Sequence, residues 1–108
     1  MEKDESIFIA GHRGLVGSAI LRKLSVEGFT RLLTRTGAKL ELTNYGAVEK
    51  FFDREKPAIV VVAAAKVGGI KANNEQPVEF LTENLLIQNN LICAAHASGV
   101  RKLLFLGS

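Results

Sequence analysis

Short apolar runs alternate along the chain with longer segments in which apolar residues recur every three or four positions. The short runs have the composition of buried strands, and they cover Ser6–Ala10, Thr30–Arg35, Ala58–Ala63 and Lys102–Leu106. The longer segments have the period of helices, and they cover about Gly14–Glu27, the stretch from an N-cap at Asn44 to Lys56-Pro57, and about Pro77–Ser98. Strands that alternate with helices are typical of a parallel sheet with helices on its faces. We therefore predict an α/β protein.

The run Ala58–Ala63 is the clearest of the predicted strands, because it is continuous and rich in β-branched residues. With strands numbered along the chain, right-handed crossovers predict the order 3-2-1-4 in the sheet. The strand order then reverses between the first and fourth strands. The segments that follow three of the strands, Gly11–Gly17, Ala63–Lys66 and Leu106–Ser108, meet there in a crevice at the carboxyl edge. Open α/β sheets bind their ligands in such a crevice.

A glycine-rich segment, Gly11-His12-Arg13-Gly14-Leu15-Val16-Gly17, joins the first predicted strand to the first predicted helix. A loop that holds a dinucleotide pyrophosphate uses its glycines for a sharp turn, for close approach of amide N–H groups to phosphate, and for close packing of the helix on the strand. The anion then lies at the partly positive N-terminus of the helix. We expect a Cβ at Gly14 to crowd both the turn and the pyrophosphate. The loop predicts a Rossmann-type doubly wound parallel sheet of the short-chain dehydrogenase variety.

The end of the second predicted strand indicates which dinucleotide is bound. An Asp or Glu there accepts a hydrogen bond from the ribose of NAD, whereas an Arg meets the 2′-phosphate of NADP. The sequence has Arg35 and no acid at this point, and Arg13 lies inside the glycine loop, so we predict NADP(H) as the cofactor. For Glu41 and Leu42, which follow, two interpretations stay open: contact with the adenine, or a helix N-terminal segment with a core leucine. We expect His12 to face solvent rather than to act as a base.

Composition narrows the class of protein further. The chain of 108 residues, 47% of them hydrophobic, suits one domain, but it is short for a dinucleotide-binding fold and ends on an apolar strand, so we expect a truncated domain. The 14 basic residues are scattered, which argues against a nucleic-acid partner, and we predict no metal site. The single cysteine, Cys93, is expected to be a buried small hydrophobe without a disulfide. No apolar stretch reaches membrane-spanning length and the N-terminus is too acidic for a signal peptide, so we expect a cytoplasmic protein.

Four segments resemble the N-terminal part of the GDP-L-fucose synthases, a family of extended short-chain dehydrogenases, and they are Gly11–Ile20, Ala63–Ile70, Ala72–Asn74 and Lys102–Ser108. The resemblance spans Ile7–Ser108, and the Ala-Ala-Lys-Val-Gly-Gly-Ile segment is much more specific than the glycine loop. It implies the NADP-binding part of an enzyme that acts on GDP-4-keto-6-deoxy-D-mannose as a 3,5-epimerase and 4-reductase. It also implies a homodimer in which the helix over residues 77–98 joins the interface.

The resemblance further implies roles for individual residues. The loop that holds the pyrophosphate would consist of Gly11, His12, Arg13, Gly14, Leu15, Val16 and Gly17, and Arg13 and Arg35 would lie near the 2′-phosphate. The family often has another basic residue two positions after Arg35, where this sequence has Gly37. The nicotinamide-side ribose would be lined by backbone atoms of Ala63, Ala64, Leu106 and Gly107. Ser108 matches the catalytic serine that hydrogen-bonds the sugar 4-keto oxygen.

The chain lacks the Tyr-x-x-x-Lys pair of short-chain dehydrogenases. In that pair the lysine lowers the pKa of the tyrosine, so that the tyrosine can donate and accept protons near neutral pH. The single tyrosine is Tyr45, and Glu49 stands four residues after it. We therefore predict that the chain alone is inactive, whereas an intact parent enzyme is an NADP-dependent oxidoreductase and epimerase. Two alternatives stay open: another extended short-chain dehydrogenase acting on nucleotide sugars, such as a dehydratase or 4-epimerase, and a non-catalytic dinucleotide-binding module.

Overall fold

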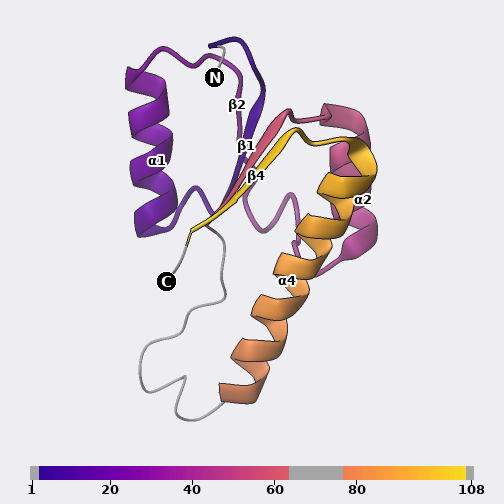
Figure 1. The fold of residues 1–108 in the computed structure, drawn as a ribbon. Coiled ribbons are helices and arrows are strands. Elements are labelled where there is room, and N and C mark those ends of the chain that lie inside the picture. The colour runs from indigo at the N-terminus through magenta and orange to yellow at the C-terminus, as the bar shows by residue number, and fades with distance from the viewer. Residues whose placement is uncertain (1–2, 64–76, 107–108) are drawn as a thin grey trace.

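A parallel sheet forms the centre of the molecule, for which a computed structural model describes residues 3–63 and 77–106 (Figure 1). Its strands are β1 (Ile7–Ala10), β2 (Leu32–Leu33), β3 (Ile59–Val62) and β4 (Lys102–Phe105), in the order β2-β1-β3-β4. All neighbours are parallel. Ile7 lies opposite both Leu32 and Ile59, and Ile59 lies opposite Lys102. The predicted doubly wound parallel α/β sheet is confirmed.

Helices lie on both faces of this sheet. α1 (Leu15–Val26) covers one face, and α2 (Tyr45–Glu55) and α4 (Pro77–Ser98) cover the other (Figure 1). The predicted N-cap of α2 is confirmed, because the Asn44 side chain accepts a hydrogen bond from the Ala47 N–H at 3.1 Å. The predicted bounds of α4 are also confirmed, and Gly99, which follows it, has a φ of +80° that favours glycine.

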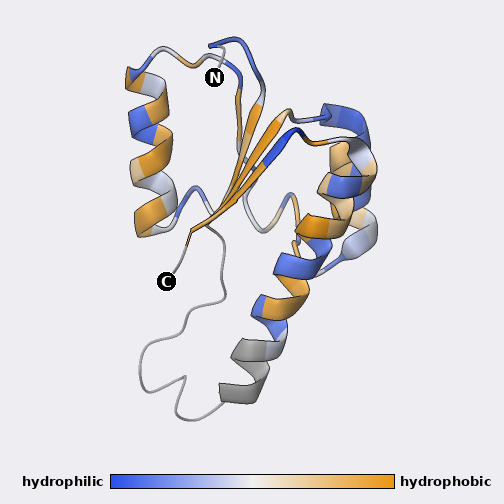
Figure 2. Cartoon of the chain, viewed as in Figure 1, coloured by the Kyte–Doolittle hydropathy of each residue, from blue (hydrophilic) through white to orange (hydrophobic). Residues whose placement is uncertain are grey.

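The strands alternate their side chains between two apolar clusters, one under each helical layer, as the period of two requires. Figure 2 shows that the strands of the sheet are mostly hydrophobic, whereas the helices carry both hydrophobic and hydrophilic residues. Ile7 and Ile9 face the α1 side, whereas Phe8 and Ala10 face α2 and α4. The Phe8 ring lies 4.6 Å from that of Phe51 and 5.9 Å from that of Phe52, measured between centroids. These contacts fix α2 against the central strand β1.

The predicted strand order 3-2-1-4 is wrong. β3 lies between β1 and β4 instead of outside β2. Every residue of β3 is buried and its backbone is paired along both edges, whereas an outer position would leave one edge of this apolar strand unpaired. Because β2 and β3 lie on opposite sides of β1, the strand order reverses between β1 and β3, and the expected crevice lies there.

The prediction that Cys93 is buried is also wrong, because its side chain is exposed. The inward face of α4 consists of Ile87, Leu91, Ala94 and Ala95, which pack into the core. The helical period places Cys93 on the flank of that stripe, where its thiol lies 3.9 Å from the Asn89 side-chain oxygen. β2 is shorter than the predicted Thr30–Arg35, since only two of its residues pair with β1.

Candidate functional site

The glycine loop makes a tight turn between β1 and α1. Gly11 has a φ of +92°, which only glycine adopts without strain, and its carbonyl accepts a hydrogen bond from the Gly14 N–H at 3.1 Å. Gly14 is the N-cap of α1, with no side-chain cap and no acidic residue in the first turn. The free amide groups and the positive end of the helix dipole therefore face the loop without a competing carboxylate. This arrangement suits a phosphate group.

The glycine that packs the helix onto the strand is Gly17. It is buried, and a Cβ built there would lie 1.9 Å from the Gly11 carbonyl oxygen and 2.7 Å from its carbon. At Gly14 a Cβ would lie 3.5 Å from that oxygen, an ordinary contact. The expectation that a side chain at Gly14 crowds the turn is therefore wrong, and the close approach falls one helical turn later, at Gly17.

The side chains of the loop leave its outer surface open. Leu15 is 87% exposed and Val16 is 51% exposed, although both are apolar. Arg13 is exposed as well, and within the described part of the chain no acidic side chain pairs with it. His12 is partly exposed, in accord with a position on the loop surface. An apolar surface beside an unpaired guanidinium is suited to a ligand that carries both a ring and a phosphate.

Arg35 follows β2 as predicted, but its guanidinium is engaged. Nη1 donates to the Thr34 carbonyl at 2.7 Å, and Nη2 donates to the Glu55 carboxylate at 3.4 Å. The guanidinium carbon lies 5.1 Å from the centroid of the Phe51 ring, within the range of a cation–π contact. The sequence pattern did not indicate these partners, because Glu55 is 20 residues away along the chain.

Glu41 and Leu42 belong to the segment that leads into α2. The Glu41 carboxylate accepts a hydrogen bond from the Thr43 hydroxyl at 2.9 Å, and Leu42 packs against the core cluster under α2 and α4. The Leu42 carbonyl accepts a hydrogen bond of 2.8 Å from the Asn90 side chain, which is only 3% exposed. The core-leucine interpretation is confirmed, and adenine contact stays a prediction. The sequence signal that could have revealed Asn90 is that it is a polar residue within the inward, otherwise apolar stripe of α4.

The ends of the strands meet at the carboxyl edge, as predicted. The Ala63 N–H donates to the Ala10 carbonyl at 2.8 Å, and the Leu106 N–H donates to the Val62 carbonyl at 3.1 Å. Ala63 and Leu106, the described residues that follow β3 and β4, therefore lie at the same edge of the sheet as the end of β1. Ala64, Gly107 and Ser108 lie outside the described residues.

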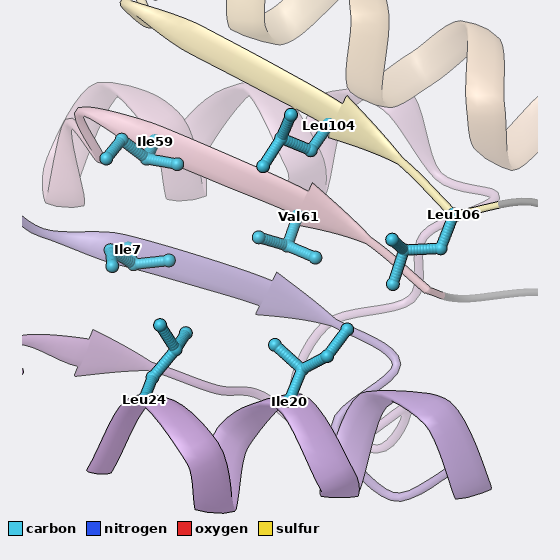
Figure 3. Close-up of a pocket in the computed structure, with 7 residues that line it drawn as sticks. All are labelled: Ile7, Ile20, Leu24, Ile59, Val61, Leu104 and Leu106. Atoms are coloured by element: carbon cyan, nitrogen blue, oxygen red, sulfur yellow. The ribbon is translucent and has the colours of Figure 1, made fainter. Parts of the chain in front are cut away.

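A small apolar groove of about 130 Å³ lies on the α1 side of the sheet (Figure 3). All of its side chains are aliphatic, and they belong to Ile7, Ile20, Leu24, Ile59, Val61, Leu104 and Leu106. Ligand pockets usually enclose about 300–1,000 Å³ and carry polar groups that orient the ligand. The groove therefore has neither the size nor the chemistry to hold a nucleotide, and the carboxyl edge remains the candidate site.

Tyr45, the first residue of α2, lacks the environment of a catalytic tyrosine. Partial burial and the neighbouring Glu49 carboxylate raise its pKa above the ordinary value, whereas proton transfer near neutral pH needs a lowered one. Within residues 3–63 and 77–106, no cluster of side chains could hold a metal ion. No helix in those ranges is long and apolar enough to cross a membrane.

The comparison with known proteins agrees with this geometry. Residues 7–108 match the model of the NAD dependent epimerase/dehydratase family. The chain belongs to this family. Proteins that resemble the chain include a putative GDP-L-fucose synthase 2 from Arabidopsis thaliana, which is 59% identical over 108 residues, and the GDP-L-fucose synthase of Escherichia coli K12, which is 52% identical over 104 residues.

The chain spans about a third of the length of these relatives: it covers 33% of the Arabidopsis protein and 32% of the E. coli protein, while 100% and 96% of the chain is matched. A solved structure, the GDP-mannoheptose C4 reductase MlghC from Campylobacter jejuni with NADP bound, superposes with a TM-score of 0.94 at 42% identity. The match covers 99% of this chain and 34% of that one. The likeness confirms the Rossmann-type fold.

Proposed function

We propose that the chain is the NADP-binding portion of a GDP-L-fucose synthase. The observation that carries this proposal is the geometry of the glycine loop, in which Gly11 turns at positive φ, Gly17 seats the helix on the loop backbone, and the amide groups at the start of α1 remain available. This cradle suits a pyrophosphate, because the N-terminus of α1 has no side-chain cap and no acidic residue in its first turn to compete with an anion. The likeness to GDP-L-fucose synthases and to a reductase that binds NADP supports the choice of cofactor and enzyme.

The residues of the loop, Gly11 through Gly17, hold the pyrophosphate in this proposal, and Arg13 meets the adenosine 2′-phosphate together with Arg35. The end of β2 carries no carboxylate that would accept a hydrogen bond from the ribose of NAD. Glu41 and Leu42 border the adenine, and Ala63, Ala64, Leu106 and Gly107 line the nicotinamide-side ribose with backbone atoms. Ser108 is the proposed catalytic residue toward the sugar 4-keto oxygen.

A bound NADPH supplies reducing power for a carbonyl group, and the intact enzyme would convert GDP-4-keto-6-deoxy-D-mannose to GDP-L-fucose by 3,5-epimerisation and 4-reduction. We propose the cytoplasm as its location, since the single cysteine of the chain excludes an internal disulfide. The described residues provide the cofactor cradle but no tyrosine with the lowered pKa that a proton donor to an alkoxide needs. The chain alone is therefore expected to bind the cofactor without catalysis.

The outward face of α4 suits a homodimer interface. Leu85 is 57% exposed, Leu86 is 41% exposed and Ile92 is 44% exposed, and they lie on the helix at spacings that place them on one side. The exposed Cys93 follows Ile92 at the border of this face. Exposed apolar residues that cluster on one helix face mark protein–protein contacts.

The experiment that tests the cofactor assignment is a titration of the chain with NADP and with NAD by calorimetry. We expect tighter binding of NADP, and Arg13→Ala should weaken NADP binding by about 1–3 kcal/mol, a factor of roughly 5 to 150, while NAD binding stays unchanged. Arg22→Ala is the matched control, because Arg22 is exposed on α1, its removal subtracts the same charge and it lies outside the glycine loop. Equal affinities of the wild-type chain for the two cofactors would contradict the proposal.

A further inference from the structure

The carboxylate of Glu55 lies between two arginines at the end of α2. Its Oε2 atom is 3.4 Å from Nη2 of Arg35 and 3.1 Å from Nε of Arg54. The Arg35 and Glu55 side chains are only 27% and 26% exposed, whereas that of Arg54 is 67% exposed. Glu55 therefore holds Arg35 in a partly desolvated pair, and Arg54 contacts it from the solvent side.

The guanidinium of Arg35 lies on the α2 side of the sheet, where it contacts Phe51 and Glu55. The glycine loop leads into α1, which packs on the other face. Phe51 and Glu55 are four residues apart on α2 and form one surface beneath the guanidinium. α2 starts near the carboxyl edge and ends just before β3, so Glu55, in its last turn, draws Arg35 toward the opposite edge.

The same location favours a cation for a second reason. The last turn of a helix carries the negative end of the helix dipole, which attracts a guanidinium. Within the described residues, the contacts of Arg35 are the Thr34 carbonyl, the Phe51 ring and the Glu55 carboxylate. Of these, only the Glu55 carboxylate bears the same charge as a phosphate. It is therefore the group that competes directly with an anionic ligand for Arg35.

We propose that Glu55 sets the strength of the preference for NADP over NAD by competing with the adenosine 2′-phosphate for the guanidinium of Arg35. The inference rests on the proposed function, in which Arg35 meets that phosphate. When the phosphate binds, Arg35 leaves the carboxylate, and the lost ion pair subtracts from the affinity for NADP. NAD carries no 2′-phosphate, so its binding leaves the pair of Arg35 and Glu55 in place.

The test is the ratio of the NAD and NADP dissociation constants of the chain, measured by calorimetry for Glu55→Gln. The amide keeps the shape of the side chain and removes its charge. We expect NADP to bind about two- to fivefold more tightly, as for the loss of a partly exposed ion pair, and NAD to bind as in the wild type. Glu49→Gln is the matched control, because it removes the same charge from α2 at an exposed position and should leave both constants unchanged.

The double variant Arg35→Ala/Glu55→Gln identifies the mechanism. In the Arg35→Ala background, Glu55→Gln should give no gain in NADP affinity, and a gain that persists would show that Glu55 acts only through the general potential of the surface. Unchanged or weaker NADP binding by Glu55→Gln alone would overturn the proposal, since weaker binding would mean that Glu55 presents Arg35 to the phosphate. Failure of the proposed function gives a different result, namely a wild-type chain that binds neither dinucleotide.

Discussion

Replacing Gly17 by alanine tests whether the glycine loop and α1 pack as closely as the structure shows. The added Cβ would lie 1.9 Å from the Gly11 carbonyl oxygen, and the separation must grow by about 1.5 Å to reach the 3.4 Å of an ordinary contact. Because the atoms that it meets belong to the backbone of Gly11 and His12, no side chain can turn aside to relieve the contact. Overpacking of this kind costs about 1–3 kcal/mol, and the rigid surroundings place Gly17→Ala near the upper limit. A loss of about 3 kcal/mol lowers the ratio of folded to unfolded molecules on the order of a hundredfold.

Gly14→Ala is the matched control, because its Cβ makes an ordinary contact of 3.5 Å and the φ of −77° suits any residue. Gly14→Ala should lower the free energy of unfolding only by the preference for glycine over alanine at an N-cap, which is about 0.5–1 kcal/mol. The free energy of unfolding is measured by urea titration with far-UV circular dichroism, for both variants and the wild type. If Gly17→Ala proves as stable as Gly14→Ala, the close packing of α1 on the Gly11 carbonyl is refuted.

Asn90→Leu should lower the free energy of unfolding by about 1–3 kcal/mol in urea titrations, because it removes a buried donor and leaves the Leu42 carbonyl without it; a cost no larger than that of Asn89→Leu, an exposed neighbour, would contradict this. Ile92→Glu should convert a dimer of the chain to a monomer in size-exclusion chromatography with light scattering, since it places a charge on the apolar outer face of α4; a dimer of unchanged stability would exclude this interface. The chain incubated with NADPH and GDP-4-keto-6-deoxy-D-mannose should show no turnover, because a general acid alone contributes about 10²–10⁴-fold. Any chain-dependent oxidation of NADPH above background would disprove that expectation.

Local pattern determined the elements of this fold. The apolar run of β3, the Asn44 cap of α2 and the bounds of α4 follow from hydrophobic period and cap chemistry, which depend on residues a few positions apart. The convergence of the strand ends at the carboxyl edge also followed, since parallel strands place those ends together whichever way they are ordered. The position of the glycine loop between a strand and a helix followed as well, and its role in holding a phosphate stays a prediction.

Other features depend on contacts between distant parts of the chain, and the sequence alone did not determine them. The position of β3 between β1 and β4 follows from burying its apolar faces and pairing both of its edges, a global requirement that no local period records. From the sequence alone, Arg35 is an unpaired cation at the end of a strand. The packing of α2 on the sheet brings Glu55 and Phe51 into contact with it. The tertiary structure also decided that Gly17 is the glycine without room for a side chain, because α1 approaches the Gly11 carbonyl there. The spacing of glycines in the sequence shows where they occur, whereas only packing shows which atoms surround them.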